Sequence, residues 1–143
     1  MHITFFVCGQ PQGKARARTV SHNGFTHSYT PKKTKQYEEA IRDTYVLSGG
    51  KQVPADVPVN VSITAVFRVP KSYTKKEKAL CYSGKRLPLG KPDVDNITKA
   101  VLDALNGVAW HDDSQVVAVD VVKLYEQEPD HEGLFINIRS VDK

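Results

Sequence analysis

Cysteine is scarce in this chain of 143 residues, and long apolar runs are absent from it. The two cysteines, Cys8 and Cys81, form no CxxC pair and show no zinc-ligand spacing, which indicates two reduced thiols in a cytoplasmic protein. No apolar run approaches the roughly 18 residues that a membrane-spanning helix needs, so we expect no membrane partner. The first ten residues, MHITFFVCGQ, have neither a basic n-region nor a long apolar segment, so we expect no signal peptide.

The signatures of several enzyme classes are also missing. The chain has no GxxxxGKS/T phosphate-binding loop, no GxSxG nucleophile elbow and no H-x-E motif paired with P-C-x-x-C. Its five histidines show no metal-ligand spacing, and only His111, beside Asp112, is a candidate neighbour of a functional site. These absences exclude P-loop nucleotide hydrolysis, α/β-hydrolase chemistry and zinc-dependent base deamination.

Positive charge is concentrated in the first two thirds of the chain. Residues 1–91 hold 16 of the 20 Lys and Arg but only 5 of the 16 Asp and Glu, whereas residues 92–143 hold 4 basic and 11 acidic residues. The net charge of +4 therefore conceals a balance of +11 against −7. A basic portion favours a polyanionic partner, and concentrated carboxylates favour either a solvated surface or a metal site.

Hydrophobic periodicity predicts one α/β domain over residues 1–143. We expect strands near 3–7, 57–69, 116–125 and 134–141, a Lys-rich helix at 72–82, a basic loop at 85–92 and a helix at about 94–105. The strand at 57–69 is the clearest, because seven apolar residues occupy alternate positions. The helix at 94–105 carries an apolar stripe at spacings of three and four. The predicted fold class is α/β of the α+β type, a small mixed sheet of about four strands with two main helices packed on it.

Local signals add a hairpin and a further helix near the N-terminus. Asn23-Gly24 is typical of a two-residue hairpin turn. Thr30-Pro31 predicts an N-cap followed by proline at the first helical position. The helix that starts there should bury Tyr37, Ala40, Ile41 and Tyr45 and end at Gly49-Gly50.

The densest group of candidate functional residues lies in the helix at 94–105 and the turn after it. Asp93 and Asp95 stand at the helix start, and Lys99 follows Asp95 by about one turn. Two further aspartates, Asp112 and Asp113, stand between this helix and the next strand. Because a helix of about 11 residues is only some 16 Å long, we expect the returning chain to bring one of them back towards the first pair.

Carboxylates in this pattern suit Mg²⁺, which takes hard oxygen ligands in an octahedron and keeps several waters. Two or three of them hold the ion and leave positions for a phosphate oxygen and an attacking water, whose pKa the metal lowers. A nearby lysine such as Lys99 orients the nucleophile or stabilises the leaving oxygen. Asp93, Asp95, one of the aspartates at 112 and 113, and Lys99 fit the requirements of such a metal site.

Simpler interpretations of the same residues stay open. An aspartate before a helix is usually an N-cap, and an aspartate four residues before a lysine usually forms a surface ion pair. Trp110 is typical of a packing residue that anchors a turn, and Asn96 of a hydrogen-bonding residue at a helix start. A calcium loop is excluded, since Ile97 and Thr98 stand where that loop needs Asp or Asn and then Gly.

The motif D-x-D-N-x-x-K, followed by a helix end and W-x-D-D-x-Q-V, resembles the RusA family of Holliday junction resolvases. In this chain it reads Lys91-Pro92-Asp93-Val94-Asp95-Asn96, then Lys99, Asp103-Ala104-Leu105 and Trp110-His111-Asp112-Asp113-Ser114-Gln115-Val116. Members of that family are small bacterial and phage crossover junction endodeoxyribonucleases that act as homodimers and use Mg²⁺. The resemblance is sharpest over residues 91–116 and extends more loosely to the whole chain.

The resemblance implies roles for individual residues. Asp93, Asp95 and Asp113 match the family's metal-binding catalytic aspartates, Lys99 matches the catalytic lysine, and Asp112 matches an accessory acid. The implied activity is Mg²⁺-dependent, with Mn²⁺ as a substitute metal, and resolves four-way junctions or other branched DNA by paired symmetric nicks in recombination and repair. Candidate DNA contacts are Lys14, Arg16, Arg18, Lys85, Arg86 and Lys91.

Two other functions remain open from the sequence. A non-catalytic module that binds branched DNA or a protein partner would use the acidic second half as a solvated or partner-facing surface. A metal-dependent hydrolase of a small phosphorylated substrate would need the same carboxylates but little affinity for DNA.

Overall fold

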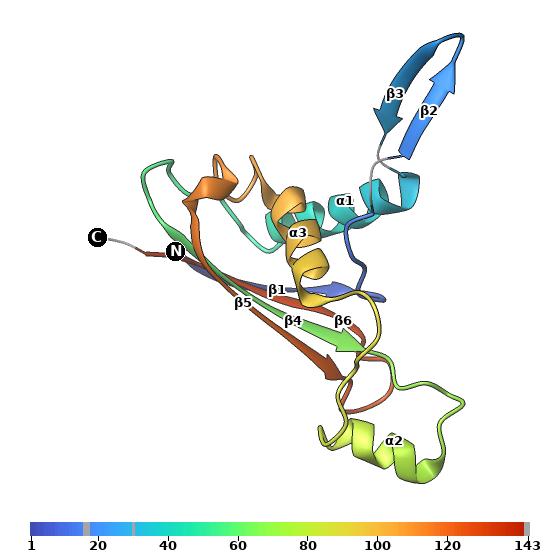
Figure 1. Ribbon diagram of the computed structural model, residues 1–143. Coiled ribbons are helices and arrows are strands. Elements are labelled where there is room, and N and C mark those ends of the chain that lie inside the picture. Colours follow the sequence, from blue (N-terminus) through green and yellow to red (C-terminus); the bar gives the residue numbers. More distant parts are fainter. Residues whose placement is uncertain (16–17, 30, 142–143) are drawn as a thin grey trace.

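A four-stranded mixed sheet forms the centre of the molecule (Figure 1). The computed structural model describes residues 1–15, 18–29 and 31–141. The strands of the sheet are β1 (His2–Cys8), β4 (Val59–Phe67), β5 (Val116–Tyr125) and β6 (Gly133–Ser140), in the order β1-β6-β4-β5. β6 pairs antiparallel with β1 and β4, whereas β4 and β5 run parallel. The predicted mixed sheet of four strands is confirmed.

β4 owes its central place to the alternation seen in the sequence. Val59, Val61 and Ile63 are buried on the face towards the helices. The strand is shorter than the predicted 57–69, because Pro58 has no amide hydrogen to donate at one end. At the other end, the Val69 amide donates to Glu126 Oε1 over 3.2 Å instead of to a strand carbonyl.

Two helices, α1 (Lys32–Leu47) and α3 (Val94–Leu105), cover one face of the sheet (Figure 1). The apolar stripe of α3 is buried as predicted, through Ile97, Ala100, Val101, Ala104 and Leu105. The core that the helices share with the sheet also encloses Trp110, which is fully buried. Burial of these stripes, rather than intrinsic helix propensity, is the main source of helix stability in a chain of this kind.

The start and the buried face of α1 differ from the prediction. Pro31 is itself the N-cap, in an extended conformation, so the helix begins at Lys32; Thr30 lies outside the described residues. The expected burial of Ala40 was wrong. The buried stripe passes through Thr34, Tyr37, Ile41 and Tyr45, which leaves Ala40 exposed. The helix ends at Leu47, and Gly49 has the positive φ of 89° that such ends favour.

Three smaller elements complete the fold. The hairpin of β2 (Arg18–His22) and β3 (Phe25–Tyr29) projects from the body, and its turn residues Asn23 and Gly24 both have positive φ, as predicted (Figure 1). At the opposite end lies α2 (Lys75–Tyr82), whose N-cap Thr74 forms a capping box with Glu77. A short 3₁₀ turn, η1 (Asp113–Gln115), precedes β5 and was not predicted. Among the described residues, no helix combines the length and apolar character that crossing a bilayer requires.

Candidate active site

The first turn of α3 presents a carboxylate that caps nothing. Asp93 occupies the N-cap position with extended backbone, and its carbonyl accepts the Ile97 amide over 3.0 Å as the helix requires. Its side chain, however, makes no capping hydrogen bond. The N-cap interpretation therefore accounts for the backbone of Asp93 but leaves its carboxylate available for another ligand.

Asp95 and Lys99 are likewise uncommitted. Both side chains are exposed on α3, one turn apart. Within the described part of the chain, neither takes part in an ion pair within 4.0 Å. The surface ion pair of the simpler interpretation does not form between them, so both groups are available to a ligand.

A cleft of about 370 Å³ lies beside Asp93. One wall is the segment 10–13, the other is formed by Lys91, Pro92, Asp93 and Asn96, and Lys33 of α1 contributes a second cation. Two lysines therefore face a cleft with one carboxylate in its wall. This arrangement suits an anion such as a phosphodiester, with the carboxylate placed to bind a cation between them.

The segment 10–14 is packed closely against the start of α3. A Cβ added to Gly13 would lie 3.0 Å from both Asn96 Nδ2 and Pro92 Cβ, and the Lys14 amide donates to the Asn96 carbonyl over 3.3 Å. Asn96 thus joins this segment to the helix start through its backbone. The cleft is consequently built by two parts of the chain that lie about 80 residues apart.

Lys14 ties α1 to α3. Its Nζ pairs with Glu38 of α1 and lies 3.3 Å from Asp103 Oδ2 of α3. Burial lowers the pKa of Lys14, but the hydrogen bonds and charges of Glu38 and Asp103 outweigh burial and raise the pKa above 10.5. Lys14 therefore has a structural role that the sequence did not suggest, and its DNA contact stays a prediction.

Asp113 is held by the hydrophobic core. The buried Trp110 donates from Nε1 to Asp113 Oδ1 over 2.8 Å, so the expected packing residue also orients a predicted catalytic carboxylate. Asp112 has a different environment. Its Oδ2 accepts the Ser114 amide over 2.9 Å as the N-cap of η1. Hydrogen bonding with the Ser114 side chain, and then with this amide, lowers the pKa of Asp112. The two neighbouring aspartates are thereby distinguished: Asp112 is a cap, whereas the second oxygen of Asp113 has no hydrogen-bond or ion-pair partner among the described residues.

The two parts of the predicted metal site are far apart within one chain. Trp110 forms a backbone bridge with Asn106, the C-cap of α3, so Asp113 lies near the opposite end of that helix from Asp93. A helix of 12 residues is about 18 Å long. In the described ranges, no group of three or more His, Cys, Asp or Glu is arranged to hold a metal ion. The expectation that the returning chain brings Asp112 or Asp113 back to the first pair was wrong, because buried Trp110 fixes the return at the far end.

Asp93 and Asp95 still form a ligand pair of the right chemistry for Mg²⁺. This ion is commonly held by one or two carboxylates, several waters and the phosphates of the substrate. Neither carboxylate has an ion-pair partner among the described residues. The pair fits a metal that is shared with a bound phosphodiester.

The predicted DNA contacts differ in their surroundings. Arg86 holds the α2 region together, because its guanidinium bonds Glu77 Oε2 over 3.2 Å and lies 4.5 Å from the centre of the Tyr73 ring. Lys85 is exposed, and Lys91 lines the cleft. Arg16 and the side chain of Arg18 lie outside the described residues.

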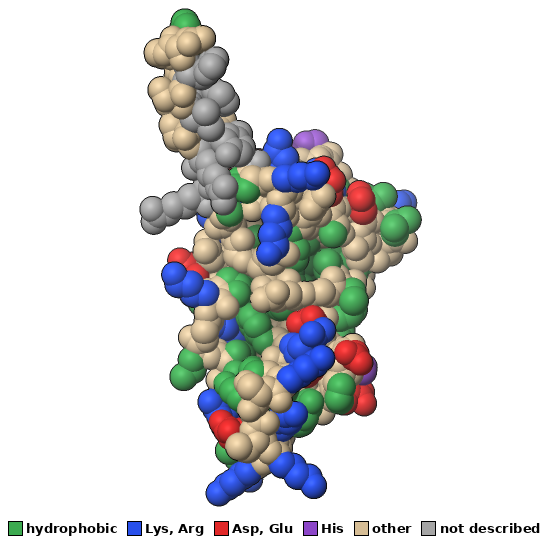
Figure 2. Space-filling view, turned by 90° about the vertical axis from the view of Figure 1, so that its right-hand side faces the viewer, with side chains coloured by type: hydrophobic (Ala, Val, Ile, Leu, Met, Phe, Trp, Pro, Cys, Tyr) green, Lys and Arg blue, Asp and Glu red, His purple; other side chains and the backbone are tan. Residues whose placement is uncertain are grey.

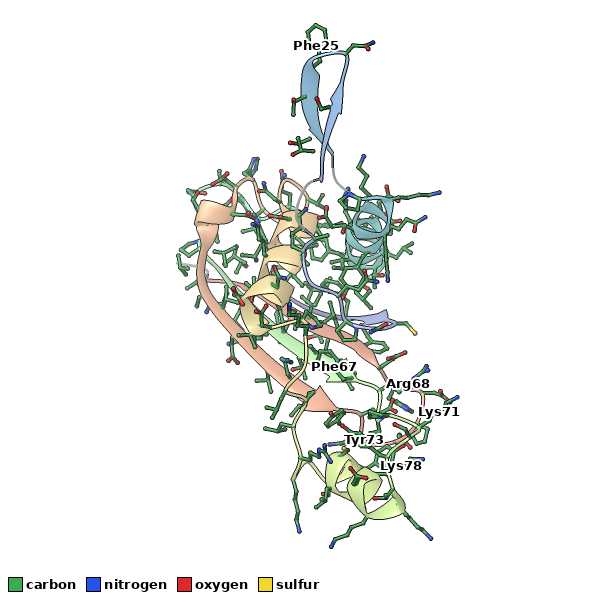
Figure 3. The ribbon with its side chains drawn as sticks, turned by 45° about the vertical axis from the view of Figure 1, so that its right-hand side comes forward. Phe25, Phe67, Arg68, Lys71, Tyr73 and Lys78 are labelled. Atoms are coloured by element: carbon green, nitrogen blue, oxygen red, sulfur yellow. The ribbon has the colours of Figure 1, made fainter. Side chains whose placement is uncertain are left out.

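A further group of cations surrounds α2 and was not assigned to DNA from the sequence. We call it the α2 lysine group: Lys71, Lys75, Lys76 and Lys78. None of the four forms an ion pair with a described residue. Lys71 and Lys78 line a second depression of about 310 Å³ together with Arg68 (Figure 3). Figure 2 shows basic side chains gathered at this end of the molecule, opposite the hairpin. The Lys-rich composition of residues 71–78 was the available signal.

Comparison with known proteins agrees with the motif. The sequence matches the family model described as Endodeoxyribonuclease RusA over residues 9–139. It is also 36% identical over 132 residues to the protein named Uncharacterized protein YqaN of Bacillus subtilis (strain 168), which covers 89% of this chain and 90% of that protein. The predicted resemblance is confirmed, and the chain belongs to the RusA family of endodeoxyribonucleases.

Proposed function

We propose that this protein is a Mg²⁺-dependent endodeoxyribonuclease that resolves Holliday junctions and other branched DNA by paired symmetric nicks, in recombination and repair. One observation carries this proposal. The carboxylate of Asp93 makes no capping hydrogen bond and lines a cleft that Lys33 and Lys91 also line. Family membership supplies the class of reaction, DNA phosphodiester hydrolysis.

The residues of the cleft have complementary tasks in this reaction. Asp93 and Asp95 would hold Mg²⁺, or Mn²⁺ as a substitute, which activates a water and neutralises charge on the phosphate oxygens when bound. Lys33 and Lys91 attract the DNA backbone to the cleft through their positive charge. Lys99, exposed and unpaired one turn along α3, stabilises the leaving oxygen or orients the attacking water.

Asp113 enters the site through a second copy of the chain. Within one chain it lies at the far end of α3 from Asp93, with one carboxylate oxygen bonded to Trp110. A homodimer with two-fold symmetry would place Asp113 of each copy against Asp93 and Asp95 of the other. Such a dimer also presents two identical sites, which suits two symmetric nicks in a four-way junction.

DNA binding is spread over more than one surface in this proposal. Lys85, Lys91 and the α2 lysine group lie on the α2 side of the cleft, while Lys14 lies on the hairpin side and is followed in the sequence by the predicted contacts Arg16 and Arg18. Cations on both sides would neutralise the phosphates of different duplex arms. Because each neutralised phosphate releases counterions, binding should be strongly salt-dependent.

The deciding experiment is incubation of the protein with a synthetic four-way junction and with a linear duplex of the same arm sequence, each with and without Mg²⁺. We expect paired nicks near the branch point of the junction only when Mg²⁺ is present, and no cutting of the duplex. Junction binding without metal-stimulated cutting would contradict the proposal and favour a non-catalytic branched-DNA-binding module. Hydrolysis of a small phosphate ester without affinity for DNA would favour the small-substrate hydrolase.

A further inference from the structure

The tip of the β2–β3 hairpin displays a largely solvent-exposed aromatic ring. Phe25 is 79% exposed and stands at the end of the projecting hairpin (Figure 3). The other exposed phenylalanines, Phe6 and Phe135, stack on each other with ring centres 4.5 Å apart. No described aromatic ring lies against Phe25. A large apolar side chain displayed in this way favours a partner surface.

The turn fixes where the ring is displayed. Asn23 and Gly24 both adopt positive φ, 50° and 80°, so Phe25 follows the turn at once and pairs with His22 across the hairpin. Each strand has five residues, and the hairpin therefore reaches about 17 Å from its base. The ring is thus held at the far end of the hairpin, residues 18–29, which we call the arm.

The charge and polarity of the arm select the chemistry of its partner. Residues 18–29 of the arm contain one basic residue, Arg18, and no Asp or Glu, and the flanking residues 14–17 and 31–35 add five more Lys and Arg and no acid. Four of the exposed side chains that the structure describes along the arm are small and carry a hydroxyl group: Thr19, Ser21, Thr26 and Ser28. A partner that is anionic along its backbone and offers flat apolar faces matches this arm. Nucleic acid with an exposed base is such a partner.

The segments that precede and follow the arm in the chain both line the cleft beside Asp93. The chain entering the hairpin passes through residues 10–13, which line the cleft, and through Lys14, which bonds the Asn96 carbonyl. The chain leaving the hairpin enters α1, where Lys33 lines the same cleft. A DNA strand bound in the cleft would therefore pass the base of the arm, with Phe25 about 17 Å further along.

We propose that Phe25 stacks on a nucleobase left exposed at a DNA branch point, and that this contact makes the protein prefer branched to linear DNA. The inference rests on the proposed function, because the cleft must bind DNA for the arm to meet a base. Inside a linear duplex every base is stacked between its neighbours, so the ring finds a free face only at the duplex ends, which the arms of a four-way junction also have. At a branch point the terminal base pair of an arm offers one.

The test compares Phe25→Ala and Phe25→Trp with the unmodified protein, by measuring affinity for a four-way junction and a matched duplex with Ca²⁺ in place of Mg²⁺. Loss of one aromatic–base stack corresponds to about a tenfold weaker affinity. We expect Phe25→Ala to bind the junction about tenfold more weakly while duplex affinity stays unchanged, and Phe25→Trp to bind as the unmodified protein does. Leu47→Ala is the matched control, since Leu47 is 87% exposed at the far end of α1 and should change neither affinity.

Tryptophan fluorescence gives a second readout. The chain has a single native tryptophan, Trp110, which is buried, so the added signal of Phe25→Trp is obtained by difference. We expect the junction to quench that signal and the duplex to leave it unchanged. Equal junction affinity for Phe25→Ala and the unmodified protein, or an equal loss for both DNAs, would overturn the inference. The inference would also be overturned if Phe25→Ala sedimented as a monomer and the unmodified protein as a dimer, because the arm would then be a subunit contact. If the unmodified protein binds no DNA at all, both the proposed function and the inference about Phe25 fail.

Discussion

The indole nitrogen of Trp110 donates a hydrogen bond to Asp113 Oδ1 over 2.8 Å. Trp110 is fully buried, so the orientation of this carboxylate is set by the hydrophobic core rather than by the surface turn that carries it. One oxygen of Asp113 is used in the bond, and no described residue bonds to the other. The hydrogen bond from Trp110 Nε1 to Asp113 Oδ1 therefore makes the orientation of a proposed catalytic carboxylate depend on the packing of the core.

Replacing Trp110 by phenylalanine tests this connection. Trp110→Phe keeps a large apolar ring but removes the donor, so Asp113 loses its fixed orientation. We expect junction cleavage to slow by about tenfold to a hundredfold and the free energy of unfolding to fall by about 1–3 kcal/mol. Single-turnover cleavage and urea denaturation measure the two effects. Ile41→Val, a buried change of about 1 kcal/mol away from Asp113, should lower stability and leave cleavage intact. Full cleavage by Trp110→Phe would show that this bond does not matter for the reaction.

Removing one carboxylate from the start of α3 should separate cutting from binding. We expect Asp95→Asn to abolish cleavage while junction affinity stays the same or rises, because a negative charge near the phosphates is lost. A gel shift run beside a cleavage assay measures both. Asp43→Asn, an exposed change of the same kind on α1, serves as the control and should cut normally. Mg²⁺-dependent cutting by Asp95→Asn at the normal rate would refute the assignment of this residue.

Lys14 should contribute to stability as well as to any DNA contact. Lys14→Met keeps the aliphatic stem but leaves Glu38 and Asp103 without their cation, and we expect a loss of about 1–3 kcal/mol in denaturant unfolding. Lys35 is exposed on α1 and forms no ion pair with a described residue. Lys35→Met should therefore change the free energy of unfolding by less than about 0.5 kcal/mol. Since the pKa of Lys14 is raised in the folded protein, its contribution is complete below pH 10.5 and disappears as pH rises through the raised value. A difference between the two proteins that persisted well above that pH would argue against the ion pair.

The cap of η1 should give an acid-dependent difference. Hydrogen bonding to Ser114 lowers the pKa of Asp112 below 3.8, so its ionised form stabilises the folded state above that pH and the effect is lost as pH falls through the lowered pKa. We expect Asp112→Asn to melt at a lower temperature than the unmodified protein at pH 7, with the gap closing towards pH 2. Asp120→Asn on β5 is the control and should show no such trend. A gap that stays constant down to pH 2 would contradict the assigned role.

The α2 lysine group should appear in the salt dependence of DNA binding. Each phosphate contact adds about 0.9 to the slope of log K against log salt. Lys75→Gln with Lys76→Gln should therefore make the slope shallower by up to about 2 and weaken junction and duplex alike. Lys51→Gln, on an exposed lysine near the end of α1, is the matched control. An unchanged slope would remove α2 from the DNA-binding surface.

Local patterns in the sequence were enough to predict most of the architecture. The alternation in β4, the stripe of α3 and the Asn23-Gly24 turn are each encoded within a dozen residues, and all three are confirmed. The motif of residues 91–116 also identified the family, because its signature residues are close in sequence. Such features are decided mainly by steric and hydrogen-bonding preferences of residues that are close in sequence, so they can be predicted without knowing the tertiary contacts.

The relations between distant residues were decided only in the tertiary structure. The pairing of Lys14 with Glu38 and Asp103 depends on how α1 packs beside α3, and the free carboxylate of Asp93 depends on which neighbours approach it. Above all, the sequence shows Asp93 and Asp113 only 20 residues apart, whereas the fold separates them by the length of α3. Backbone bridges from Trp110 to Val53 and Asn106, together with burial of the Trp110 side chain, set that separation. Burial is a property of the whole core that spacing along the chain does not contain.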